Sequence, residues 1–408
     1  MKYLFIPTFI ILLTFNAVKG QINGQTTSIT GQTGVVTTTV PFLLITPDAR
    51  SGGMADAGVA ISPDANSIYW NPAKIAFAPN DMAFSIGYTP WLRALVPDVS
   101  LSSLSGYKKI DDRSGIGMSF RYFAQGTVNF VDTSNKILQN YNPTEFSIDA
   151  GYARKLSEHF SLAVTGSFIY SDILGNTTLY NGIITHSVSD LAVGFSGYYT
   201  KKININEKEA DIAFGGNINN IGPKISYING GNTYFIPINL KLGGYLNYHL
   251  NDENELGLTL DLNKLLVPTT PIYATDSNGA LMYNSDGTPK IVKGKNPNVS
   301  VLQGMIQSFY DAPNGFSQEM ALIDPCIALE YRYLHKYSAR IGYFYEDPNE
   351  GDRQYLTVGL GANILGIVLD VSYLIPTNNN PPFNVSPLTN TFRISLSTNI
   401  NKGKLVKN

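Results

Sequence analysis

The chain has 408 residues, of which 43% are hydrophobic, 12% aromatic and only 15% charged, whereas ordinary soluble domains carry about 25% charged residues. Because 29 Lys and Arg face 31 Asp and Glu, the formal net charge is −2, and a nucleic-acid-binding surface, which needs a clustered basic excess, is not expected. The single cysteine, Cys326, excludes a disulfide framework and a multi-cysteine metal site.

The first 20 residues have the features of a secretory signal peptide. Lys2 precedes an uncharged apolar stretch, and Val18 and Gly20 occupy the −3 and −1 positions of a cleavage site before Gln21. The stretch is shorter than the roughly 20 residues of a membrane-spanning helix. We therefore expect export and cleavage. Since no later apolar stretch is long enough for a spanning helix, a membrane form would be a β-barrel.

Two short regions follow. Residues 21–41 are rich in Thr, Gly and Gln and are predicted to be a flexible extension. Residues 42–80 are rich in Ala, Gly and Ile, and Ser62 and Pro63 predict a helix start with Ser as N-cap and Pro at the first position. Because these helices are too short to stand alone, we predict that residues 42–80, called the hatch, pack inside the rest of the fold.

From residue 81 onward the hydrophobic pattern has a period of two. Leu258 and Leu260, for example, alternate with Thr259 and Asp261, which places one row of side chains against an apolar medium and the other against a polar one. Fourteen such segments are predicted as strands: 82–89, 98–106, 115–123, 144–155, 160–171, 187–200, 209–219, 236–250, 255–265, 322–334, 339–346, 354–363, 366–375 and 390–400.

The connections between these strands are alternately long and short. The long connections follow the odd-numbered strands and include residues 124–143, 172–186 and 266–321. Long loops on one rim and short turns on the other are typical of outer-membrane barrels, extracellular and periplasmic respectively, and a β-sandwich does not require them. Tyr and Phe near strand ends are predicted to form aromatic girdles: Tyr88, Tyr122, Phe123, Tyr170, Tyr198, Tyr199, Tyr343, Tyr345 and Tyr373.

The predicted fold is therefore an all-β transmembrane fold, a 14-stranded antiparallel outer-membrane β-barrel at residues 81–401 with a small N-terminal helical hatch (plug) in the lumen. Residues 402–408 are predicted as a periplasmic basic tail, with both termini periplasmic. Arg in place of Leu258 or Leu396, on the lipid-facing row, is expected to disrupt assembly, and Arg in place of the lumen-facing Thr259 or Ser395 to be milder.

The longest loop, 266–321, contains a candidate partner-docking surface. Asn278-Gly279 and Asp286-Gly287 predict two tight hairpin turns, and long ordered loops are usually functional. The apolar residues that could anchor a partner are Ile272, Tyr273, Leu281, Met282 and Tyr283. The alternative is that the loop only shields the barrel mouth.

No catalytic residue, metal site or cofactor is predicted. The four histidines have no metal-ligand spacing, and the sequence contains neither a G-x-S-x-G elbow nor a phosphate-binding P-loop. Ionisable residues on the lumen row are expected to pair with one another or with a plug: Arg121, Lys241, Asp261, Arg340, Asp370 and Arg393.

The stretch ARSGGMADAGVA at 49–60, followed by SPDANSIYWNPAK at 62–74, resembles the N-terminal hatch of FadL-type barrels, with Asn71, Pro72 and Ala73 as the shared motif. The longer sequence at 62–74, together with FSIGYTPWL at 84–92, is similar to sequences of the PorV family (also called LptO), the outer-membrane component of type IX secretion in Bacteroidetes.

This resemblance implies a non-enzymatic protein of the Gram-negative cell outer membrane, surrounded by outer-membrane lipid and LPS. It implies that the protein binds the C-terminal signal domains of secreted cargo at the type IX translocon and delivers the cargo to the attachment-complex proteins. Two alternatives stay open: a FadL-like channel for hydrophobic small molecules, and a lipid-modifying surface enzyme, for which the sequence offers no convincing nucleophile–base pair.

Overall fold

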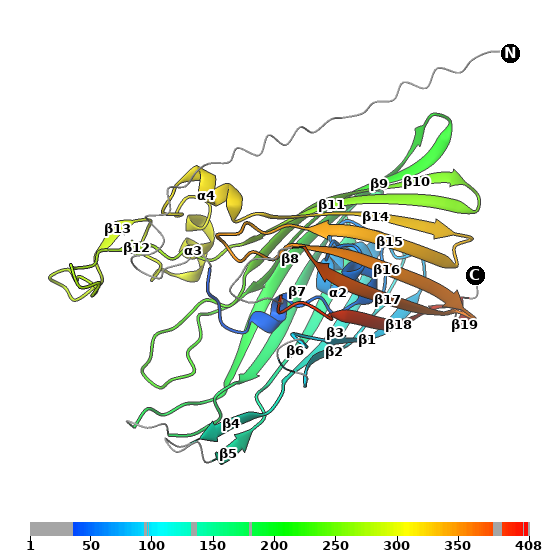
Figure 1. The fold of residues 1–408 in the computed structure, drawn as a ribbon. Helices are drawn as coiled ribbons and strands as arrows, with labels where there is room; N and C mark the ends of the chain where they lie inside the picture. Colours follow the sequence, from blue (N-terminus) through cyan, green and yellow to red (C-terminus); the bar gives the residue numbers. More distant parts are fainter. Residues whose placement is uncertain are drawn as a thin grey trace.

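The computed structural model describes residues 36–93, 96, 98–131, 137–178, 182–377, 386–402 and 404–406. The expected signal peptide and most of the expected extension lie outside the described residues. The main sheet closes on itself because its first strand, β1 (Met82–Pro90), pairs with β18 (Phe392–Asn401). Figure 1 shows the resulting barrel from the side.

All neighbouring strands of the barrel are antiparallel. Between β1 and β18 the order is β2 (Val99–Lys109), β3 (Ser114–Gln125), β6 (Thr144–Lys155), β7 (Phe160–Asp172), β8 (Val188–Ile205), β9 (Lys208–Ile221), β10 (Asn239–Asn251), β11 (Asn254–Leu265), β14 (Asp324–Tyr333), β15 (Tyr337–Phe344), β16 (Tyr355–Ile364) and β17 (Ile367–Pro376). The predicted fourteen-stranded barrel is confirmed. The largest difference in a boundary is at β8, which continues to Ile205.

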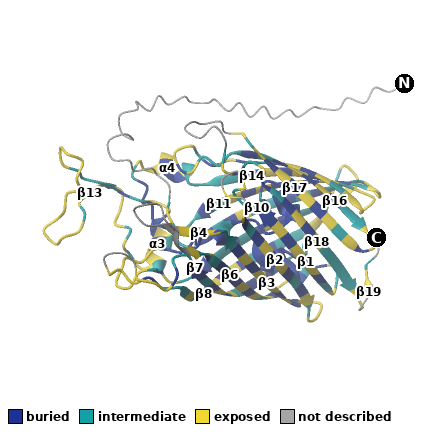
Figure 2. Cartoon of the chain, turned by 60° about the horizontal axis from the view of Figure 1, so that its bottom comes forward, coloured by how far each residue is buried: buried dark blue, intermediate teal, exposed yellow. Residues whose placement is uncertain are grey.

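The alternation in the sequence corresponds to the two faces of the wall. Leu258 is 42% exposed on the outer face, whereas the next residue, Thr259, is 1% exposed and faces the lumen. The same alternation appears as bands of exposed and buried residues along the strands in Figure 2. The outer face is thus apolar, as contact with lipid requires, and the inner face is polar.

The connections divide between the two rims as predicted. The short-turn rim carries connections such as 206–207, 252–253 and 365–366, and the long-loop rim carries 266–323. The short-turn rim also carries β19 (Lys404–Leu405), which pairs back onto β18, so part of the expected basic tail is a strand. At the long-loop rim the backbone N–H of Thr39 donates to Phe235 O, and the described chain therefore begins and ends at opposite rims.

The remaining elements outside the hatch belong to the long loops. They are β4 (Val128–Val131), β5 (Ile137–Tyr141), β12 (Ile272–Tyr273), β13 (Ile291–Lys293), α3 (Val301–Gln307) and α4 (Phe316–Ala321). Within the described part of the chain, no helix is both long enough and apolar enough to cross a membrane.

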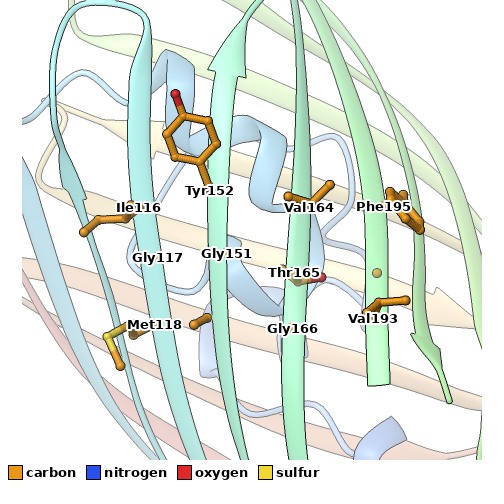
Figure 3. A pocket seen from close by; sticks show the side chains of 12 residues that line it. Ile116, Gly117, Met118, Gly151, Tyr152, Val164, Thr165, Gly166, Val193 and Phe195 are labelled. Carbon is orange, nitrogen blue, oxygen red and sulfur yellow. The ribbon is translucent and has the colours of Figure 1, made fainter. Parts of the chain in front are cut away.

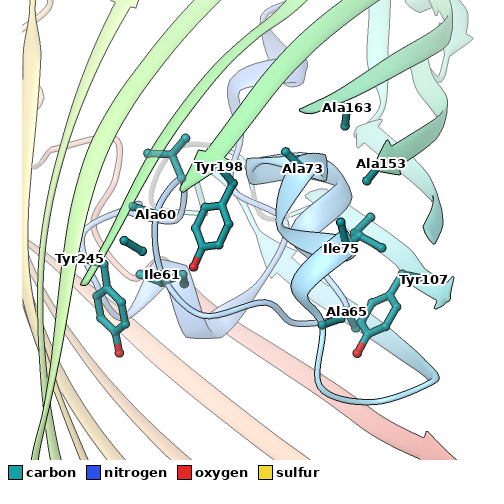
Figure 4. Packing of buried hydrophobic residues seen from close by; sticks show 14 of the residues in the cluster. Ala60, Ile61, Ala65, Ala73, Ile75, Tyr107, Ala153, Ala163, Tyr198 and Tyr245 are labelled. Atoms are coloured by element: carbon teal, nitrogen blue, oxygen red, sulfur yellow. The ribbon is translucent and has the colours of Figure 1, made fainter. Parts of the chain in front are cut away.

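The hatch lies inside the barrel. Its short elements are η1 (Pro41–Leu44), α1 (Ala49–Gly52), α2 (Ser67–Trp70) and η2 (Pro72–Phe77). Figure 4 shows small hatch residues such as Ala60 and Ala73 close to Tyr198 and Tyr245 of the wall. Wall glycines permit this proximity, since a Cβ on Gly87 would lie 2.3 Å from Pro47 O.

Two local predictions were wrong. No helix begins at Ser62, because Arg50 takes both its hydroxyl and its carbonyl oxygen as hydrogen-bond acceptors, at 2.7 and 3.2 Å; α2 begins instead at Ser67. Phe123 and Tyr198 do not belong to an aromatic girdle. Both are buried in the lumen, where Phe123 stacks on Phe42 of the hatch.

A chain of buried charges joins the hatch to the wall. Arg50 of α1 binds Asp64 at 2.9 Å and Glu330 of β14 at 3.1 Å. Glu330 also accepts from Arg340 at 2.8 Å, and Arg340 binds Asp370 at 2.6 Å. Each charge in this chain has an opposite charge within hydrogen-bond distance, which offsets the desolvation cost of burying it.

We expect Glu330→Gln to lower the free energy of unfolding by about 3–5 kcal/mol, because it leaves two buried guanidinium groups without their shared carboxylate. Urea unfolding of the barrel in lipid vesicles measures this change. The control is Lys202→Met, which removes an exposed pair with Glu209 at 3.7 Å and should cost only about 0–1 kcal/mol. Equal costs for both variants would contradict this role of Glu330.

We expect Leu258→Arg to reduce insertion, because a cation facing lipid near the bilayer midplane costs about 2–4 kcal/mol. A mild effect of Arg in place of Thr259 is no longer expected, because the Thr259 side chain is buried and its hydroxyl donates to Gly244 O at 3.2 Å. Thr259 is therefore not a suitable control for insertion. Ile364→Arg, at an exposed strand end, is the better control and should cost about 0–1 kcal/mol. Heat-modifiability of the folded barrel on gels reports insertion, and similar yields from both variants would argue against the assigned depth.

Candidate functional site

The Asn71-Pro72-Ala73 motif connects the helix η2, the hatch backbone at Val59 and the barrel strand β8. Asn71 caps η2, since its Oδ1 accepts from the backbone N–H of Ala73 at 3.1 Å, and Pro72 is the first residue of that helix. The Nδ2 of Asn71 donates to Val59 O and to Gly197 O of β8, both at 3.0 Å. The amide side chain is required here because a carboxylate in its place has no donor for these carbonyls.

The ionisable residues predicted on the lumen row are buried and have the expected kinds of partner. Arg121 pairs with Asp149 of the next strand at 3.2 Å. Asp261 accepts from the backbone N–H groups of Gly58 and Val59 in the hatch, at 2.7 and 2.9 Å. Further contacts to the hatch include Arg393 with Asp56 at 3.3 Å and Lys241 Nζ over the Trp70 ring at 4.1 Å. Arg121 also donates to Leu43 O of the hatch at 3.1 Å.

An apolar depression of about 530 Å³ lies in the lipid-facing wall, across β3, β6, β7 and β8. Figure 3 shows Met118, Val164 and Phe195 around it, and the small residues Ala150 and Gly166 also line it. Because its large side chains belong to the outer row, this surface suits an acyl chain of the membrane.

A second cavity, of about 460 Å³, lies at the barrel mouth. We call it the mouth cavity. Its walls come from residues 36–46 and from β10, β11, β14, β15 and β16 near the long-loop rim. The charged residues that line it are Asp56, Lys241, Asp324, Glu346, Glu350 and Arg353. Burial raises the pKa of the Glu350 carboxyl, because desolvation disfavours its charged form.

The second half of the longest loop carries an exposed apolar surface on α3 and α4. Its most exposed side chain, Phe316, is 79% exposed. The six exposed apolar residues, called the α3–α4 patch, are Leu302, Ile306, Phe309, Tyr310, Phe316 and Met320.

The segment with these helices is anchored to the first part of the same loop and to the barrel. The Asp311 carboxylate accepts from the backbone N–H and the hydroxyl of Thr269, at 3.1 and 2.7 Å, and burial raises its pKa. Lys264 of β11 binds Glu319 of α4 at 3.2 Å. The α3–α4 patch is therefore presented by an ordered platform.

The predicted docking residues lie elsewhere in the same loop. Ile272 and Tyr273 form β12 and are half-buried, whereas Leu281, Met282 and Tyr283 are exposed. The two predicted turns around these three residues are confirmed, with Gly279 and Gly287 at φ of 81° and 80°. We call residues 272–293 the arm.

The α3–α4 patch was not predicted from the sequence, although a signal for it is present. Leu302, Ile306 and Phe309 have helical spacing. Ser300 precedes them, and its hydroxyl accepts from the backbone N–H of Gln303 at 3.4 Å as an N-cap.

Comparison with solved structures finds barrels of low sequence identity. The toluene transporter TbuX of Ralstonia pickettii is 11% identical, with 87% of this chain and 98% of that chain covered and a TM-score of 0.44. The toluene transporter TodX of P. putida is 10% identical, with coverage of 87% and 98% and a TM-score of 0.46. A Pseudomonas aeruginosa FadL homologue is 11% identical, with coverage of 90% and 100% and a TM-score of 0.43.

A search of curated protein sequences gave no match. The family model described as type IX secretion system protein PorV matches residues 28–272. This match spans more than half of the chain, and a closed barrel with an apolar outer face belongs in an outer membrane. The chain is therefore a member of the PorV family, an outer-membrane component of type IX secretion.

Proposed function

We propose that this protein binds secreted cargo through the cargo's C-terminal signal domain at the type IX translocon and delivers it to the surface attachment complex, without catalysis. The membership in the PorV family supports a role in type IX secretion. The observation that supports docking is the α3–α4 patch, an exposed apolar surface on the longest loop.

The α3–α4 patch suits a protein partner for two reasons. Leu302 and Ile306 are exposed one turn apart on α3, and exposed apolar patches mark interaction sites. Aromatic residues such as Phe309, Tyr310 and Phe316 belong to types that contribute most to binding. The platform is already ordered by Asp311 and Glu319, so binding requires little further ordering of the loop.

The rims give the proposed orientation. Outer-membrane barrels have short periplasmic turns and long extracellular loops, which supports an orientation with the α3–α4 patch outside the cell and β19 on the periplasmic side. The described chain begins with residue 36 near the mouth cavity. Residues 1–35 and 407–408 lie outside the described residues, so the periplasmic position of both termini stays a prediction.

The alternative of a channel for hydrophobic molecules is not favoured. Such a route needs an apolar site beside the hatch, whereas the mouth cavity is lined by six charged residues. The hatch is also held by buried ion pairs through Arg50 and Arg393.

We expect the combined variant Leu302→Ser, Ile306→Ser and Phe316→Ser to lose co-purification with the translocon and to reduce secretion of cargo into the medium. Each side chain is exposed, so the barrel should still fold, and each lost apolar anchor should cost more than about 1 kcal/mol of binding. Deletion of the whole loop is a less specific test of docking, because it also removes the contact of Gly304 in α3 with Phe235 of another loop.

The matched variant changes Leu281, Met282 and Tyr283 of the arm to Ser, which tests the docking residues predicted from the sequence. A loss confined to this variant would assign docking to the arm. Wild-type capture and secretion by both variants would reject the docking function of the loop and favour a role as a shield.

A further inference from the structure

The mouth cavity contains buried hydrogen-bond acceptors that lack donors. Glu350 is 6% exposed. Its Oε1 accepts from Gln318 at 2.8 Å, but within the described part of the chain no donor reaches its buried Oε2. Asn263, which also lines the cavity, likewise has a buried Oδ1 without a partner among the described residues. Unmet acceptors in a desolvated site are costly, so they indicate a missing donor.

The charges around the cavity do not supply that donor. Arg353 is committed to Glu346 by two hydrogen bonds of 2.8 Å and lies 3.8 Å from Asp324. Lys241 Nζ lies over the Trp70 ring at 4.1 Å.

Two further charged groups, Asp56 of the lining and Lys264 between the lining residues Asn263 and Leu265, are also engaged. Asp56 is bound by Arg393 at 3.3 Å and by the Tyr355 hydroxyl at 2.6 Å. Lys264 binds Glu319 at 3.2 Å. Glu350 therefore remains without a cation among its described neighbours, in a cavity with more carboxylates than cationic side chains.

The apolar part of the lining fits the stem of a long cationic side chain. Leu44, Leu265 and Phe344 line the same cavity, and Lys and Arg bury their methylene stems against apolar surface while their charged ends meet polar groups. Leu322, the C-cap residue of α4, also lines the cavity, so the cavity is continuous with the helices that carry the α3–α4 patch.

We propose that the mouth cavity binds the Lys or Arg side chain of an extended segment of the captured protein, with its cationic end on Glu350 Oε2. This inference rests on the proposed function and adds the chemistry of the captured segment. A charge-assisted hydrogen bond to a carboxylate is the strongest contact that the unmet acceptor can make.

The test uses the full chain in lipid nanodiscs and a fluorescent capped peptide, Gly-Ser-Lys-Ser-Gly, with binding followed by anisotropy. We expect Glu350→Gln to weaken binding at least about tenfold, the low end for a hydrogen bond to a charged group. Norleucine in place of the peptide's Lys should have a similar effect. Asp252→Asn, at an exposed turn of the opposite rim, is the matched control and should change binding by less than about twofold. Equal binding of the Lys and norleucine peptides would overturn the inference.

A second pair of variants tests whether Glu350→Gln weakens peptide binding only by disturbing the fold of the loop. Leu322→Lys places an ammonium group at the cavity wall and should abolish peptide binding, whereas Leu322→Met should retain it. Butylammonium distinguishes a small-amine site from a peptide site: full competition at the same concentration as the peptide would overturn recognition of an extended segment.

The serine variant of the α3–α4 patch distinguishes docking through that patch from cation binding in the mouth cavity. If this variant loses cargo capture but still binds the peptide, the cavity and the docking surface are both supported as distinct contacts. If it retains capture while Glu350→Gln loses the peptide, docking through the α3–α4 patch is rejected and the cation site stands.

Discussion

The fold depends on one constraint: the polar inner face of the barrel packs against the hatch, so its buried charges need partners within the protein. The outer row must be apolar to contact lipid, and because side chains alternate along each strand, the inner row is left for charged residues such as Arg340 and Asp370. The hatch meets this constraint by bringing its own charges, and Arg50 is the clearest case because it lies between Asp64 and Glu330. A hatch without such groups would leave Arg393, which is buried and pairs with Asp56, without that partner, at a cost of several kcal/mol.

This constraint also restricts where function can lie. Asp261 and Asn71 fix hatch backbone to the wall by direct hydrogen bonds, so the lumen is a packed interior rather than an open passage. The wall itself is closed by the pairing of β1 with β18. What remains available to a protein partner is the long-loop rim, where the apolar residues of α3 and α4 are exposed.

The sequence predicted the barrel well because a period of two is a local signal. Leu258 and Thr259 already distinguish the two faces without any knowledge of their neighbours. The helix expected at Ser62 failed for the opposite reason, since the Arg50 side chain, distant in sequence, takes the oxygens that a cap would use. The mouth cavity was equally out of reach, because Leu44, Asn263 and Glu350 meet only after the barrel closes.

The unmet acceptors of the mouth cavity stand out against this background. Around Glu330 and Asp370 every buried carboxylate has a cation within hydrogen-bond distance, whereas Glu350 has only a neutral amide donor on one oxygen. Buried carboxylates without a cation, such as Asp261 and Asp311, have a hydrogen-bond donor on each oxygen, whereas Oε2 of Glu350 has none among the described residues. Since such a group lowers stability unless a partner neutralises it, its position beside α4 is best explained by a donor that arrives with the captured chain.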